Sequence, residues 1–188
     1  MKRNSAVLLF ASLAALAGCQ DATSTTSPTL SRSDAKNAAA AQRAAEVRIM
    51  DACDPTTFAG VPGGCQRNGG MKFDTFLSIL TETGSVPAWH FSPPDLYIRE
   101  GDSFSATNYG GENHTFTEVD EFGGGIVPML NQLSGNTKVA PECNTLGQSD
   151  FLTPGSSSPP DTPDEVGDEH YQCCIHPWMR MTVHIRAR

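Results

Sequence analysis

Positive charge is scarce in this chain of 188 residues, which has 13 Lys and Arg against 21 Asp and Glu and a formal net charge of −8. Such an acidic chain disfavours nucleic-acid binding, because phosphates must be neutralised by basic residues, and it suits a basic or cationic partner. No internal repeat is visible, and no hydrophobic run beyond the N-terminus is long enough to span a membrane. Length and composition therefore predict one domain of modest size.

The N-terminus has the pattern of an export signal. Lys2 and Arg3 precede a mostly apolar run at 6–17, which ends in Leu16-Ala17-Gly18-Cys19. The run is too short to span a bilayer, and its ending is typical of bacterial lipoprotein signals, which are cleaved before the cysteine. We predict a signal peptide at 1–18 and lipidation of Cys19, with an ordinary secretory signal as the alternative. The mature protein is then expected in the cell envelope of a bacterium, anchored at the periplasmic face or in the outer membrane.

A cysteine, a histidine and a methionine lie close together near the C-terminus, in Cys173-Cys174-Ile175-His176-Pro177-Trp178-Met179. A thiolate, an imidazole and a thioether in one tight loop suit copper that cycles between Cu(I) and Cu(II), because sulfur ligands favour the reduced ion and imidazole tolerates both. The loop therefore predicts a redox-active copper site.

The order Cys-x-x-His-x-x-Met resembles the ligand loop of the cupredoxins, the small blue copper proteins, and the proline after the histidine makes the amicyanin-like form the most similar. Two upstream segments agree with this family in the right order: 91–102, with its Gly-Asp turn, and 108–115. The resemblance covers roughly residues 86–188. It implies one type 1 copper held by His114, Cys173 and His176 in a trigonal plane, with Met179 as the weak axial ligand.

Two departures from the family pattern flank the first histidine. Asn113 and Thr115 occupy positions where plastocyanin-like members commonly have Pro and Asn. The hydrogen bonds that hold the thiolate are therefore expected to differ, which affects the reduction potential more than copper binding.

A second methionine competes for the axial position. Met181 has the plastocyanin-like spacing from His176, but it also continues an apolar stripe with Val183 and Ile185. We prefer Met179, because the proline in the loop keeps it short and stiff.

Short β-favouring segments separated by turn residues continue from residue 86 to the C-terminus. Their spacing predicts an all-β fold, a cupredoxin-like Greek-key sandwich. Strands are expected at 86–91, 95–99, 103–108, 114–119, 169–174 and 179–186. The long connection at 120–168 is predicted to contain a short strand or helix first and a mobile acidic loop afterwards.

We predict two parts in the mature chain. Residues 19–50 form a tether with a short helix, and residues 51–188 form a domain whose core is 86–188. Alanines give residues 34–49 high helix propensity and little to bury, so a short, mostly solvated helix is expected there. A helical stripe that stops at Gly84 predicts one helix packed on the sandwich. This stripe consists of Phe73, Phe76, Leu77 and Leu80.

Strand alternation separates the two adjacent cysteines. The side chains of Tyr171 and Cys173 share one face of a strand and that of Cys174 lies on the other, so Cys174 is free to pair if Cys173 faces the metal. In an exported chain the cysteines other than Cys19 and Cys173 are disulfide candidates, and we favour Cys53–Cys65 with Cys143–Cys174. Free thiols, or joint binding of a softer metal by Cys173 and Cys174, are the alternatives.

The ligand set predicts a one-electron carrier and not an enzyme, because a cage that rearranges little between Cu(II) and Cu(I) permits fast transfer. Multicopper enzymes need further histidine pairs, whereas this chain has five His and no His-x-His. A copper-binding or delivery module without a redox partner is the second class. The resemblance implies that a redox partner protein docks at His176, Pro177 and Trp178. The docking surface of that partner is expected to be basic. Packing of Trp178 in the core is the alternative.

Other polar residues are expected to be solvated. The histidines outside the predicted site lie on the outer faces of strands, and the acidic residues near it lie in loops. These residues are His90, His170, His184, Glu112, Asp120 and Glu121.

Overall fold

The computed structural model describes residues 44–61 and 64–188. The predicted signal peptide at 1–18, the lipidation site Cys19 and the tether that follows it lie outside the described residues, as does the first part of the helix expected at 34–49. Among the described residues, no helix is both long enough and apolar enough to cross a membrane.

The first sheet has the strand order β2-β1-β4. Its strands are β1 (Ala44–Met50), β2 (His90–Ser92) and β4 (Ser103–Asn108), and the central strand β1 runs parallel to β4 and antiparallel to β2. Residues 44–49 therefore form a strand, and the helix prediction is wrong there. Val47 and Ile49 are fully buried and alternate with Glu46 and Arg48, so burial in the sheet outweighs the helix propensity of the alanines.

The second sheet has the order β3-β9-β8-β6. Its strands are β3 (Asp95–Arg99), β9 (Arg180–Arg186), β8 (Gly167–Gln172) and β6 (Thr117–Val119), while β5 (His114–Thr115) pairs with β7 (Phe151–Leu152) in a small third sheet. Most strands match the prediction to within a few residues. The segment 114–119 is divided between β5 and β6, and in 86–91 only the last two residues are in a strand.

One hydrophobic core joins the two main sheets. Val47, Phe91 and Phe104 of the first sheet belong to the same buried cluster as Met181 and Val183 of the second. The ring of Phe104 packs edge-on against that of Tyr171, with 5.4 Å between ring centroids. The sandwich predicted from strand alternation is thus present.

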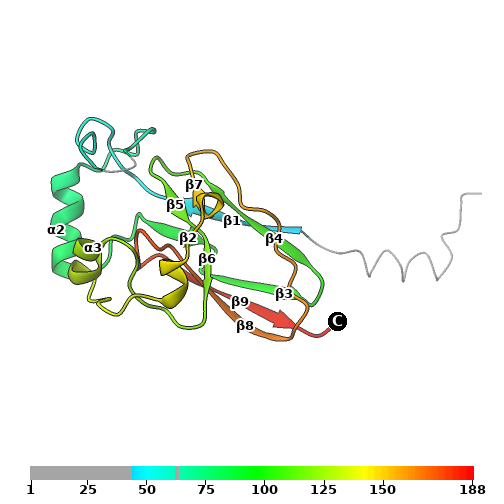
Figure 1. Ribbon diagram of the computed structural model, residues 1–188. Coiled ribbons are helices and arrows are strands. Elements are labelled where there is room, and N and C mark those ends of the chain that lie inside the picture. Colours follow the sequence, from blue (N-terminus) through cyan, green and yellow to red (C-terminus); the bar gives the residue numbers. More distant parts are fainter. Residues whose placement is uncertain (1–43, 62–63) are drawn as a thin grey trace, which may run out of the picture. The chain divides into compact units, whose positions relative to one another are not determined.

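The helix predicted from the aromatic stripe is α2 (Phe73–Thr83). Phe76 and Leu80 are buried, and the helix ends at Gly84, whose φ of 72° is the left-handed conformation that glycine adopts without a steric cost. The shorter helix α3 (Pro128–Leu133) lies beside α2 (Figure 1), and residues of both line one cavity.

The long connection contains more structure than expected. Besides α3 and β7 it includes two 3-10 turns, η1 (Pro141–Asn144) and η2 (Gln148–Asp150). Its acidic second half pairs along the edge of β4: the backbones of Phe104 and Asp161 exchange hydrogen bonds of 2.9 and 2.8 Å, and Thr107 forms a bridge with Ser157. The expected mobile loop is therefore a cover for the strand edge, because the free N–H and C=O groups of an edge take partners.

Both preferred disulfides are present, Cys53–Cys65 and Cys143–Cys174. Cys174 lies in a small buried cluster with Val119, Ala140 and Cys143, whereas Cys173 belongs to the main core and is the free cysteine of the described residues. The opposite orientation of the adjacent cysteines is confirmed.

Candidate metal centre

Three predicted ligands converge in the interior. The nearest donor atoms of His114, Cys173 and His176 all lie within 4.8 Å of one another, and all three residues are buried. The Cys173 Sγ lies 3.7 Å from the Nδ1 of His114 and 3.8 Å from the Nδ1 of His176. Both imidazoles therefore present the same ring nitrogen to the thiolate, as two ligands of one metal ion would.

Backbone hydrogen bonds hold the C-terminal loop in a tight turn. The Cys173 N–H donates to the Met179 carbonyl at 3.0 Å, and the Met179 N–H donates to the His176 carbonyl at 2.9 Å. Strand β8 leads to Cys173 and β9 starts after Met179, while His114 enters from β5. Strand β5 and the turn between β8 and β9 thus position the three donors.

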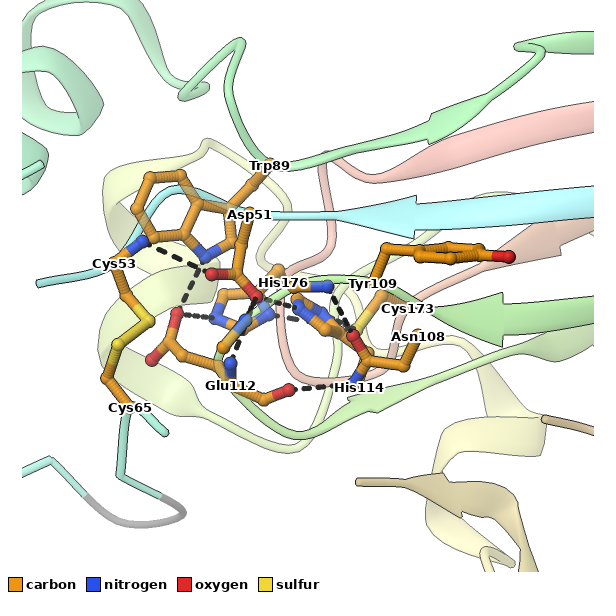
Figure 2. A network of polar contacts seen from close by, with 12 residues as sticks. Asp51, Cys53, Cys65, Trp89, Asn108, Tyr109, Glu112, His114, Cys173 and His176 are labelled. Carbon is orange, nitrogen blue, oxygen red and sulfur yellow. Dashed lines mark hydrogen bonds and ion pairs between the residues drawn. A yellow bond between two sulfur atoms is a disulfide. The ribbon is translucent and has the colours of Figure 1, made fainter. Parts of the chain in front are cut away.

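Two buried carboxylates face the other nitrogens of the histidines (Figure 2). The Nε2 of His114 donates to Asp51 Oδ2 at 2.9 Å, and the Nε2 of His176 lies 3.7 Å from Glu112 Oε2. A carboxylate behind a ligating histidine fixes the ring's tautomer and orientation and increases its basicity. Both rings are therefore oriented with Nδ1 toward the site.

The Asp51 carboxylate is held by the turn before His114. It accepts hydrogen bonds from the backbone N–H groups of Gly111 at 2.8 Å and Glu112 at 3.0 Å. A Cβ on Gly110 would lie 1.9 Å from Asp51 Oδ2, so only glycine permits this approach. Asp51 follows β1 directly, which connects the N-terminal strand to the site.

The Glu112 carboxylate is fixed by an indole. Trp89 Nε1–H donates to Glu112 Oε2 at 2.7 Å, and both residues are buried. The expectation that Glu112 is a solvated loop residue is therefore wrong. Its burial raises the pKa of the carboxyl group, an effect that the nearby His176 opposes.

The contacts among the donor residues favour a charge-separated arrangement. Burial by itself would raise the pKa of Cys173, but its contacts with His114 and His176 outweigh burial and hold it well below its usual range. Burial lowers the pKa of His114, yet Asp51 and Cys173 raise it to about 9 overall. Burial likewise opposes ionisation of Asp51, but His114 and two backbone N–H groups lower its pKa to about 2. A thiolate is the form that ligates metal.

Thr115, one of the two departures from the family pattern, contacts both cysteines. Its backbone N–H donates to the Cys173 Sγ at 3.4 Å, and its hydroxyl accepts from the Cys174 N–H at 2.7 Å. Hydrogen bonds to the cysteine sulfur tune the potential of such a site.

The residues of the predicted docking surface are buried or partly buried. His176 is 3% exposed and Pro177 is buried, while Trp178 is partly buried and packs near Phe76, with 6.0 Å between ring centroids. Helix α2 carries Phe76 and Leu77, and both residues line one cavity with His176. Docking of a redox partner at these residues therefore stays a prediction.

Both candidate axial methionines are buried. Met181 lies in β9 opposite Tyr171 and alternates with Val183 and Ile185 in the core, as its apolar stripe predicts. Met179 belongs to the ligand loop itself and is bonded through its backbone to Cys173 and His176. Met179 therefore remains the proposed axial ligand.

The other histidines lie away from the site. His90 is exposed and His170 partly exposed, as expected for outer faces. His184 is also on an outer face, but it forms ion pairs with Asp168 at 2.8 Å and Asp95 at 3.3 Å.

Asp51 is not among the predicted site residues, and Glu112 is predicted to be solvated. Asp51 is more than 60 residues from His114 and follows a segment with a helical composition. It could have been predicted only if β1 had been recognised as a strand that ends beside the site. The signal available for Glu112 was its position two residues before His114.

The donor set fits copper. Two imidazoles and one thiolate in a buried cluster, with the Met179 thioether nearby, form a type 1 copper-like site. Each imidazole has a carboxylate behind it, and the thiolate has a backbone N–H.

Comparisons with known proteins give likenesses of fold only. No family profile matches the chain, and no curated protein matches it. A purple cupredoxin from Nitrosopumilus maritimus is 19% identical over 76% of this chain and 99% of that chain, with a TM-score of 0.43. An oxidised plastocyanin from Dryopteris crassirhizoma is 14% identical over 76% of this chain and 100% of its own, with a TM-score of 0.38. A reduced amicyanin variant is 19% identical over 50% of this chain and 70% of that chain, with a TM-score of 0.33. Because these TM-scores are low, any conclusion about function depends on the geometry of the site.

Proposed function

We propose that this protein is a type 1 copper protein that carries single electrons. The observation that supports this most directly is the convergence of two imidazole Nδ1 atoms on a buried thiolate, each ring being backed by a carboxylate. When bound there, copper would supply a centre that accepts and releases one electron. His114, Cys173 and His176 would hold it, with Met179 as the axial ligand.

The surrounding chain keeps the donors in place. His114 is fixed by Asp51, the loop by its backbone hydrogen bonds, and Cys174 by the disulfide to Cys143. A site that changes little between oxidation states suits electron transfer. It is poorly suited to copper delivery, the second class, because metal exchange needs accessible donors and these are buried.

We also propose export and lipid anchoring at Cys19, in the envelope of a bacterium. The N-terminal residues support this, as do two disulfides, which persist in oxidising compartments. Loss of Lys2 and Arg3 with the signal makes the mature chain still more acidic, which suits a basic redox partner.

The test is an absorption spectrum of the mature chain with Cys19→Ser, which prevents lipidation. We expect one copper ion per chain and an intense visible band in the oxidised state, because thiolate-to-Cu(II) charge transfer requires the sulfur in the coordination plane. Metal analysis measures the number of copper ions per chain, and the spectrum measures the visible band. A colourless Cu(II) complex with an ordinary tetragonal spectrum would contradict the proposal.

Substitution of each candidate methionine distinguishes the axial ligand from a residue that only packs in the core. Met179→Leu should leave copper bound and coloured but raise the reduction potential, because loss of a donating sulfur destabilises Cu(II) relative to Cu(I). Met181→Leu should leave the potential nearly unchanged and cost less than about 1.5 kcal/mol of stability, as volume-conserving core exchanges do. Voltammetry on both variants decides: a large shift for Met181→Leu alone would make Met181 the axial ligand.

A further inference from the structure

An apolar cavity of about 380 Å³ reaches His176 from the side covered by the two helices. Its walls are aromatic and aliphatic side chains of α2, of α3 and of the segment near residue 58. They include Phe58, Phe73, Phe76, Leu77, Met129 and Leu130. Two polar side chains that matter to the proposed metal site also line it, Glu112 and His176.

The cavity has the properties of a small-molecule site. Such sites commonly measure about 300–1,000 Å³ and combine mostly apolar walls with a few convergent polar groups. Here the convergent groups are a carboxylate and a metal ligand that lie 3.7 Å apart. His176 lines the cavity and is only 3% exposed, so a small molecule in the cavity reaches its ring more readily than a protein surface does.

The lining also restricts the chemistry of the ligand. Apolar walls penalise charged molecules, because these lose hydration that the cavity does not replace. Planar aromatic molecules are favoured by the rings of Phe58, Phe73 and Phe76. The Glu112 carboxylate, oriented by the hydrogen bond from Trp89, accepts hydrogen bonds, so the ligand should carry a hydroxyl donor.

We propose that the cavity binds a small neutral aromatic alcohol of the hydroquinone class, which donates one electron to the metal site through His176. This rests on the proposed function as a copper protein. One hydroquinone would lose one electron and one proton: the electron would pass to copper held by His114, Cys173 and His176, reducing it from Cu(II) to Cu(I), and the proton would pass to bulk water. Two of the resulting radicals disproportionate in solution to one quinone and one hydroquinone, which balances the reaction.

The test uses hydroquinone itself and variants that fill the cavity. In the copper-loaded mature chain with Cys19→Ser, the rate of loss of the visible band should saturate with hydroquinone concentration. Leu77→Trp should lower the rate at low hydroquinone by about tenfold, equivalent to about 1.4 kcal/mol of lost binding. Met129→Trp should act in the same direction and is expected to fold, because Met129 is 58% exposed.

Calorimetry on the metal-free protein tests binding without any redox step. The unaltered cavity should bind one hydroquinone, and Leu77→Trp should abolish this. Val166→Trp is the matched control, since Val166 is 56% exposed and does not line the cavity. It should change neither binding nor rate, and all variants should keep the same reduction potential.

The two proposals fail in different ways. Absence of the visible band would overturn the copper assignment, and with it the redox role of the cavity. A normal band with a linear dependence on hydroquinone, no calorimetric binding, and equal rates in Leu77→Trp and Val166→Trp would overturn the cavity proposal alone.

Discussion

Cys173→Ser should abolish the intense visible band of the oxidised, copper-loaded protein while the chain stays folded. The band requires a thiolate bound to Cu(II), and Cys173 is the free cysteine of the described residues, with both Nδ1 atoms within 3.8 Å of its sulfur. A serine hydroxyl has nearly the same shape but is neither a soft ligand nor ionised at neutral pH. Absorption spectroscopy measures the band, and circular dichroism checks the fold.

The adjacent cysteine provides the control. The double variant Cys143→Ser/Cys174→Ser should keep the band and lose about 2–4 kcal/mol of stability, because it removes a disulfide that constrains the unfolded chain. Denaturant titration measures this loss. Two folded variants that lose their colour equally would show that both adjacent cysteines contribute to the metal site.

Asp51→Asn should weaken copper binding by about 10–100-fold, the usual effect of changing a group behind a metal-ligating histidine. The Asp51 side chain is 1% exposed and accepts the Nε2–H of His114. The substitution removes one negative charge from the surroundings of the site. This loss destabilises Cu(II) more than Cu(I), so the reduction potential should also rise. Competition with a chelator measures the affinity, and voltammetry measures the potential.

Asp54→Asn is the matched control for this variant. Asp54 lies three residues further along, and its carboxylate bonds with Thr56 and Thr57 instead of a metal ligand. Its replacement should change neither affinity nor potential. Equal effects of the two substitutions would show that Asp51 acts only through net charge and not through its hydrogen bond to His114.

Local patterns predicted much of the structure. The helix α2 follows from apolar residues three and four apart and a terminal glycine, and β8 and β9 follow from alternation in period two. The same alternation separated Cys173 from Cys174 and so predicted the pairing of Cys174. These features depend on neighbours in the chain, which a sequence displays directly.

Two expectations failed because their outcome depended on distant partners. Residues 44–50 have a helical composition, yet they form a strand because β4 and β2 offer their backbones on both sides. The acidic segment around Asp161 has a loop composition, yet it pairs with β4 because that edge would otherwise be open. In both cases tertiary hydrogen bonding overrides a weak local preference.

The order and spacing of the candidate ligands from Cys173 to Met179, and most of the strands that carry them, can be predicted from the chain alone because they are local properties. The surroundings of these residues depend on tertiary packing. Asp51 reaches His114 across 63 residues, Trp89 fixes Glu112 across 23, and side chains of α2 line one cavity with His176. Such contacts arise from the folding of separate segments onto one another, so the environment of the site is set by packing.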